Sequence, residues 1–232
     1  MPGPSSKRSH PSVVAVGASG AGGLLDMAHL LSLLPVSFPG VILLTLHRPV
    51  DRPSNLASIL QRVSALPVMV ASRLQLLHPG TCYVGEPAAH LTLYSSTAIE
   101  LVADLGHGYR NRTIDLLFGS VAIYAANRAI GVVLSGSLAD GSRGLAAITQ
   151  AGGVSMARDP RQHFEGDMPR NAIAAAGPLH CVDYVPGLAR EIVTQVVGTG
   201  ADVLPAGQRM VSLHRLQSSY AKTHRPLNCY NA

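Results

Sequence analysis

Tryptophan is absent from the sequence, and charged and aromatic residues are scarce. Aromatic residues make up 4% of the 232 residues and charged residues 13%, which is about half the charged share of an ordinary soluble domain. A nucleic-acid-binding face usually combines basic side chains with aromatic ones, so we expect no nucleic-acid partner. Because 47% of the residues are hydrophobic, the chain can bury a core and is not expected to be disordered.

Long hydrophobic runs are also lacking. A membrane-spanning helix needs about 18 to 20 consecutive apolar residues, whereas the longest clean run, residues 41–46, has the length of a buried strand. Residues 1–11 carry a basic pair with no apolar stretch behind it, so they do not resemble a signal peptide. We therefore expect a cytoplasmic protein with no membrane insertion.

Cysteine is rare and widely spaced. Cys82, Cys181 and Cys229 form no CxxC pair, which argues against a disulfide framework and against a zinc site. The net charge of +5 comes from the ends of the chain, because six of the 18 basic residues lie before residue 9 or after residue 208 and no acidic residue follows Asp202. The middle of the chain holds 12 basic and 13 acidic residues and offers no strongly basic face.

Short runs rich in β-branched residues alternate with helical patterns between residues 13 and 204. We expect one domain there, preceded by a flexible leader (1–12) and followed by a basic, poorly ordered tail (205–232). The alternation predicts an α/β fold: a doubly wound, mostly parallel sheet flanked by helices, with a small antiparallel β excursion. Strands are expected at 13–16, 41–46, 67–71, 81–84, 90–94, 99–102, 130–134 and 154–157, and helices at 24–34, 55–63, 113–128, 144–151, 171–176 and 188–197.

A glycine-rich turn is expected at residues 17–23, directly after the first strand. It lacks the third glycine of the dinucleotide-binding fingerprint, and the second strand is followed by His47 rather than by an acid. It also lacks the Lys-Ser or Lys-Thr pair of a phosphate-binding loop. Ala21 stands where a GxSxG nucleophile turn has its last glycine. The turn therefore matches neither nucleotide-binding motif and departs by one position from the nucleophile motif.

Three polar residues, Ser19, His47 and Asp140, follow three of the expected central strands. The carboxyl ends of parallel strands meet at one edge of a sheet, where ligands bind, so these side chains are expected to lie together. A serine, a histidine and an acid can form a hydrolase triad, in which the histidine takes the serine proton and the carboxylate orients the imidazole. Each residue alone also has a structural interpretation: a helix cap, a polar strand end and a turn residue, respectively.

The segments that carry these residues resemble the catalytic domain of bacterial chemotaxis protein-glutamate methylesterases (CheB), in order and over about residues 13–197. That family has a GAS-T-GG turn after its first strand, a QHMP segment after its second and a TGMGxDGAxG loop near the middle. The corresponding segments here are 17–23 (GASGAGG), 46–49 (LHRP) and 135–144 (SGSLADGSRG), and further similar segments are 79–91, 112–122, 151–153 and 166–173.

The resemblance implies that Ser19 is the nucleophile, His47 the general base and Asp140 the orienting acid, with Gly20 and Ser137 in the oxyanion and substrate region. It implies hydrolysis of glutamyl methyl esters on the cytoplasmic helices of chemoreceptors, with release of methanol, and deamidation of selected glutamines. No cofactor and no metal are implied. The partner is then the methylated cytoplasmic domain of a chemoreceptor.

The sequence also departs from the family pattern. The glycine turn is one residue longer, Ser137-Leu138 replaces Met-Gly, and Arg48 replaces Met beside the expected base, where a cation would disfavour the protonated imidazole. These differences leave two alternatives open: a weakened or inactive relative that serves as a receptor-binding module, and a small-molecule serine esterase.

The family's usual architecture includes a receiver domain ahead of the catalytic domain. About 12 residues precede the first expected strand, too few for such a domain. The expectations that follow are constitutive activity, regulation by a separate receiver protein, or a chain that is a fragment of a longer protein.

Overall fold

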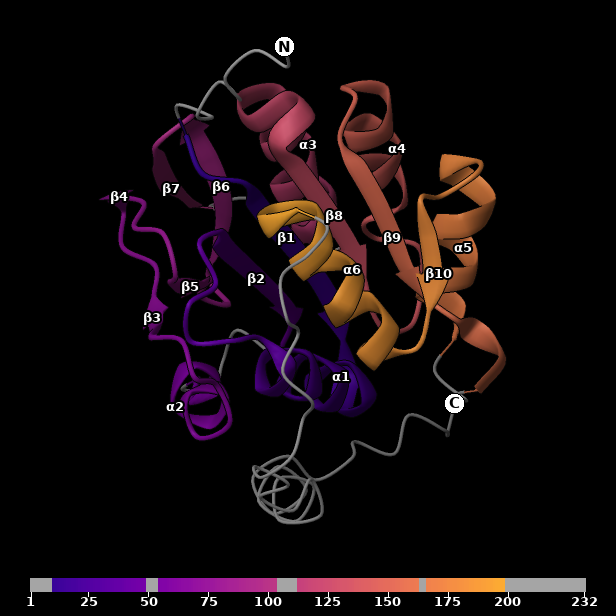
Figure 1. Cartoon of the computed structure of the whole chain (residues 1–232), viewed down its shortest axis with the longest axis horizontal. Helices are drawn as coiled ribbons and strands as arrows, with labels where there is room; N and C mark the ends of the chain where they lie inside the picture. Colours follow the sequence, from indigo (N-terminus) through magenta and orange to yellow (C-terminus); the bar gives the residue numbers. More distant parts are fainter. Residues whose placement is uncertain (1–9, 49–53, 104–111, 163–165, 199–232) are drawn as a thin grey trace, which may run out of the picture.

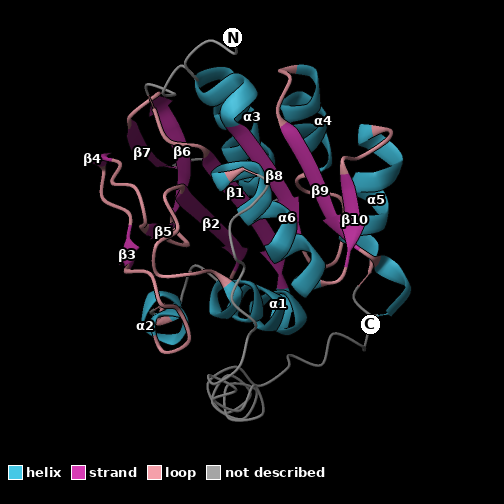
Figure 2. Cartoon of the chain, in the orientation of Figure 1, coloured by secondary structure: helices cyan, strands magenta, loops and turns pink. Residues whose placement is uncertain are grey.

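The structure is a computed structural model, and it describes residues 10–48, 54–103, 112–162 and 166–198. Seven parallel strands form its main sheet, in the order β10-β9-β8-β1-β2-β5-β3. Figure 2 shows them as magenta arrows, and the arrows of β9 and β10 point toward the carboxyl edge at the bottom of the view. The strands are β1 (Val13–Ser19), β2 (Val41–His47), β3 (Val68–Val70), β5 (Cys82–Val84), β8 (Ala129–Val133), β9 (Val154–Arg158) and β10 (Cys181–Asp183).

Helices cover both faces of this sheet. One face carries α1 (Gly20–Leu33), α2 (Leu56–Gln61) and α6 (Val185–Val197), and the other carries α3 (Thr113–Ala125), α4 (Ser142–Gln150) and α5 (Asp167–Ala176). In Figure 1, α6 crosses in front of the central strands. Successive side chains of a strand point to opposite faces, so β1 contributes Val14, Val16 and Ala18 to the core under α1 and α6, and Val13 and Ala15 to the core under α3. Short 3-10 turns lie at Ala126–Arg128 and Pro160–Gln162.

A separate antiparallel sheet contains β4 (Leu74–Leu76), β7 (Ala98–Ala103) and β6 (Ala89–Ser95), in that order. Its buried Leu91, Leu93 and Ile99 belong to the same core as α3. The Leu93 N–H donates a hydrogen bond to Ser120 Oγ of α3 (2.9 Å), which joins the edge of β6 to this helix. The predicted doubly wound sheet and the small antiparallel excursion are therefore confirmed.

The glycine-rich segment 17–23 is not a separate turn, contrary to the prediction. The ladder between β1 and β2 continues through Gly17 and Ala18 to Ser19, and α1 begins directly at Gly20. Gly17 has to be glycine inside the strand, because an added Cβ would lie 2.3 Å from Ile114 Cγ2. The helix expected from residue 24 therefore begins four residues earlier.

Other boundaries also differ from the expectation. α5 begins at Asp167, four residues before the predicted start, and the three-residue strands β4 and β10 are unpredicted. No side chain of β4 or β10 is fully buried, so no apolar run marks these strands in the sequence. None of the helices in the described ranges combines the length and the apolar character that crossing a bilayer requires.

The limits of the predicted leader and tail stay predictions, because residues 1–9 and 199–232 lie outside the described residues. The residues just before β1 are tied to the domain. Arg128 Nη1 donates to the carbonyl oxygen of Pro11 (2.6 Å), and the Val41 N–H donates to that of Ser12 (2.9 Å).

Candidate active site

The candidate site lies at the carboxyl edge of the main sheet, where the direction of winding reverses. From β1 the chain continues to β2 on one side and later returns to β8 on the other side. In open α/β sheets, the crevice at such a reversal is where ligands bind. Ser19 is the last residue of β1 and His47 the last residue of β2, and the two are register partners in the parallel ladder. Neighbouring strands lie about 4.8 Å apart, so the two residues are adjacent.

The side chains of Ser19 and His47 belong to the same face of the sheet. Val13 and Ala15 of β1, like Val41 and Leu43 of β2, point to the core under α3. Because side chains alternate along a strand, Ser19 and His47 continue the same two rows toward α3. Both residues are partly exposed, so the edge on which they lie is open to solvent.

His47 is bound to Asp140. His47 Nε2 lies 2.6 Å from Asp140 Oδ2, and the side chains are 23% and 3% exposed. Because a carboxylate only accepts hydrogen bonds, we assign the proton to Nε2 and the lone pair to Nδ1 in the neutral form of the imidazole. Nδ1 is then the nitrogen that can accept a proton from a hydroxyl group.

The carboxylate of Asp140 is also the cap of α3. Its Oδ2 accepts the Ile114 N–H (2.9 Å), and its Oδ1 accepts the Asp115 N–H (2.9 Å). These N–H groups belong to the first turn of the helix, which has no internal acceptors for them and favours a negative charge. The helix therefore holds both carboxylate oxygens of Asp140, independently of the bond between Asp140 and His47.

A second carboxylate extends this arrangement. Asp115 Oδ1 accepts the Gly144 N–H at the start of α4 (2.8 Å), so α3 and α4 are tied to the loop of Asp140. Burial raises the pKa of Asp115, and the nearby charge of Asp140 raises it further, against hydrogen bonds from Gly144 and Gly141 that lower it. Sequence reasoning missed this role, because only the fold brings the start of α4 to Asp115.

Ser19 does not act as a side-chain cap. It occupies the N-cap position of α1 with extended backbone angles, and its hydroxyl makes no capping hydrogen bond. Gly20 follows with φ of +70°, the left-handed region in which glycine avoids steric cost. This conformation turns the chain from strand into helix within one residue. The helix-cap interpretation of Ser19 is therefore not supported, and its hydroxyl is available at the site.

The loop from Ser135 to Gly141 is tied to α5. The Met168 N–H donates to Gly136 O (3.0 Å), and Asn171 Nδ2 donates to Leu138 O (2.7 Å). Leu138 has φ of +70° and is 67% exposed. Ser137, expected in the oxyanion and substrate region, is exposed on the same loop.

Arg48, the cation expected beside the base, points to other partners. Its Nη1 donates to Ser54 Oγ (2.5 Å), and its Nη2 donates to the carbonyl oxygen of Gly85, which directly follows β5. The guanidinium therefore connects the end of β2 to the end of β5.

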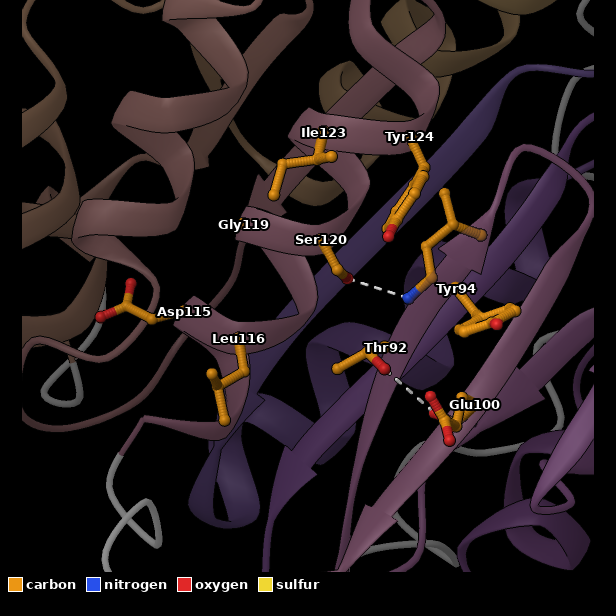
Figure 3. A pocket seen from close by; sticks show the side chains of 10 residues that line it. Thr92, Tyr94, Glu100, Asp115, Leu116, Gly119, Ser120, Ile123 and Tyr124 are labelled. Carbon is orange, nitrogen blue, oxygen red and sulfur yellow. Dashed lines mark hydrogen bonds between the residues drawn. The ribbon is translucent and has the colours of Figure 1, made fainter.

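A separate hollow of about 440 Å³ lies between α3 and β6. Figure 3 shows Ile123 and Tyr124 on the helix, opposite Thr92 and Tyr94 on the strand. Ile123 is 74% exposed at this hollow. The residues that line this hollow do not include Ser19, His47 or Asp140. Within the described ranges, no three His, Cys, Asp or Glu side chains are grouped as metal ligands.

Comparisons with known proteins identify the family of this chain. Residues 14–190 match the CheB methylesterase family. The chain is 35% identical over 175 residues to a protein-glutamate methylesterase/protein-glutamine glutaminase of Pectobacterium atrosepticum, which covers 74% of this chain and 49% of the relative. It is 33% identical over 181 residues to a second such protein of Pseudomonas syringae, with coverage of 78% and 53%.

The fold is similar to a solved structure as well. The crystal structure of the Thermotoga maritima CheB methylesterase catalytic domain matches with a TM-score of 0.73 at 24% identity, over 80% of this chain and 99% of that one. The chain spans about half the length of the curated relatives it matches. On the match over residues 14–190, the chain belongs to the CheB methylesterase family.

Proposed function

We propose that the chain is a serine hydrolase that cleaves glutamyl methyl esters in a protein substrate, with Ser19, His47 and Asp140 as its triad. The observation that carries this proposal is the 2.6 Å hydrogen bond between His47 Nε2 and Asp140 Oδ2. The pairing of Ser19 with His47 on neighbouring strands supports it. Membership of the CheB methylesterase family supports the same reaction, since the relatives are named for it.

In this reaction, His47 Nδ1 takes the hydroxyl proton of Ser19 while Oγ attacks the ester carbonyl. Negative charge develops on the carbonyl oxygen, and we assign its stabilisation to the N–H groups of Gly20 and Ser137. The intermediate then collapses, the bond to the methoxy oxygen breaks, and the imidazolium gives its proton to form methanol. Asp140 orients the imidazole and stabilises its positive charge.

Water completes the cycle. The same imidazole takes a proton from a water molecule that attacks the acyl-serine, and a second tetrahedral intermediate releases the free glutamate and the Ser19 hydroxyl. Hydrolysis of a glutamine amide would follow the same steps with ammonia as the leaving group. The relatives' names include protein-glutamine glutaminase, so we propose deamidation as a second reaction of this site.

The substrate that we propose is the methylated cytoplasmic domain of a chemoreceptor, which locates the reaction in the cytoplasm. Leu138 supports a protein substrate, because it offers an exposed apolar side chain on the loop beside the triad. An edge that is accessible to a helical protein substrate would also be accessible to small esters, so the assay has to compare the two.

Methanol release from a methylated receptor fragment tests this proposal. We expect release by the wild-type protein at a higher kcat/KM than on short esters, and no release by Ser19→Ala. Activity on short esters alone would favour a small-molecule esterase. Binding of the fragment without any release would favour an inactive receptor-binding relative.

A further inference from the structure

A group of buried polar side chains lies beneath the loop that carries Asp140, outside the proposed triad. Asp26 of α1 and Ser135 are 7% and 0% exposed, and the side chain of Arg158 at the end of β9 is 12% exposed. Arg158 Nε lies 3.1 Å from Asp26 Oδ2. Arg158 Nη1 donates a hydrogen bond to Ser135 Oγ at 2.6 Å.

Asp26 binds Ser135 at two points. The Ser135 N–H (3.2 Å) and the Ser135 hydroxyl (2.5 Å) both donate to Asp26 Oδ2. One bond holds the main chain of Ser135 and the other holds its side chain. The two bonds together hold the Cα of Ser135, to which its carbonyl group is attached.

That carbonyl group contacts the proposed nucleophile. Ser135 O accepts the Ser19 N–H at 3.1 Å, which continues the ladder between β1 and β8 beyond the Leu134 N–H bond to Gly17 O (2.9 Å). The next residue, Gly136, lies so close that an added Cβ would be 2.7 Å from Ser19 Cβ. A shift of Ser135 would therefore move the Ser19 main chain or break its hydrogen bond.

We propose that Asp26 and Arg158 are positioning residues that hold Ser135 and, through it, the Ser19 main chain in the geometry needed for attack. This inference rests on the proposed function, because Ser19 is the group being positioned. A buried ion pair is a weak source of stability compared with well-packed apolar side chains. A reacting group, by contrast, has to be held within about 0.5 Å of its productive position. The two hydrogen bonds from Ser135 to Asp26 Oδ2 restrict the movement of Ser135 in this way.

Three variants separate positioning from stability: Asp26→Asn, Arg158→Gln and the double variant. Each single variant leaves a buried charge without its counterion, which destabilises the fold, whereas the double variant removes both charges and recovers stability. Arg161→Gln is the matched control. It breaks a neighbouring ion pair with Asp159 in which the arginine side chain is 83% exposed.

Two readouts report on Ser19 itself. One is the exchange rate of its amide proton relative to that of Leu44 in β2, and the other is the rate at which a fluorophosphonate labels its hydroxyl. In Asp26→Asn and in the double variant, we expect relative exchange at least 10-fold faster and labelling at least 10-fold slower. The free energy of unfolding should return toward the wild-type value in the double variant, and Arg161→Gln should leave both rates within twofold.

Wild-type exchange and labelling rates in the double variant would overturn the inference, because the pair would then act through stability alone. A wild-type protein whose Ser19 is not labelled would contradict the proposed function instead. In that case the exchange rate of the Ser19 amide still decides whether the pair positions its main chain.

Discussion

Replacing Gly136 by alanine would place a methyl group against the proposed nucleophile. The new Cβ would lie 2.7 Å from Ser19 Cβ, 3.0 Å from Ser19 N and 3.0 Å from Met168 Cε. Carbon atoms pack best at about 3.5 to 4.0 Å, so a separation of about 1 Å has to be created. Met168 Cε is the end of a flexible side chain and can move, whereas Ser19 is held in the ladder of β1.

The displacement therefore falls on Ser19 or on the loop that faces it. A misplacement of about 1 Å in a reacting group costs on the order of a hundredfold in rate, and overpacking of this kind costs about 1 to 3 kcal/mol in stability. We expect Gly136→Ala to lower kcat for ester hydrolysis by about 10- to 100-fold and to remain folded.

Gly119→Ala is the control for this experiment. Gly119 lies within α3, and an added Cβ would meet no heavy atom within 4 Å. Alanine favours a helix over glycine by about 1 kcal/mol, so this variant should be slightly stabilised with unchanged kcat. A Gly136→Ala protein that hydrolyses esters at the wild-type rate would refute the packing argument at Ser19.

Three further predictions concern the loop of Asp140 and its neighbours. Asp140→Asn should lower kcat by roughly 10⁴-fold, because an amide has one acceptor oxygen, whereas His47 Nε2, the Ile114 N–H and the Asp115 N–H now share two carboxylate oxygens. A loss under tenfold in kcat would contradict the assigned role. Leu138→Gly should raise the free energy of unfolding, measured by chemical denaturation, by up to about 1 kcal/mol. The left-handed conformation costs a residue with a Cβ about 1 to 2 kcal/mol, and glycine avoids this cost but loses more conformational entropy on folding, which offsets part of the gain. A decrease in the free energy of unfolding would contradict this prediction. Asp115 should titrate above 3.8 by NMR. The folded state then holds the Asp115 proton more tightly than the unfolded chain does. The protonated Asp115 therefore contributes fully to the free energy of unfolding below pH 3.8, and this contribution is lost as the pH rises through the raised pKa. A titration midpoint of Asp115 at or below 3.8 would be inconsistent with burial as the cause.

Much of the fold could be predicted from the sequence, because the central strands are short, continuous apolar runs. Residues 41–46 and 130–134 were predicted within one residue of β2 and β8. The glycine-rich segment was predicted wrongly, since glycine usually ends a strand but here continues one under the side chain of Ile114. β4 and β10 carry no buried run that could mark them.

The site could be predicted only in part. Ser19 and His47 are adjacent because they end neighbouring parallel strands, a relation that the order of strands and polar residues already suggests. The contacts of Asp26 with Ser135 join residues 109 positions apart. No local pattern indicates such a contact, because it depends on how α1 packs against the end of β8.

Covalent labelling of Ser19 tests the central claim most directly. Wild-type protein, Ser19→Ala and His47→Gln would each be treated with a fluorophosphonate, and the adduct would be located by mass spectrometry of the peptides. We predict one adduct in the wild-type protein, on Ser19, none in Ser19→Ala, and labelling at least about 100-fold slower in His47→Gln. A folded wild-type protein without an adduct on Ser19, or one that is labelled equally fast without His47, would contradict the proposed triad.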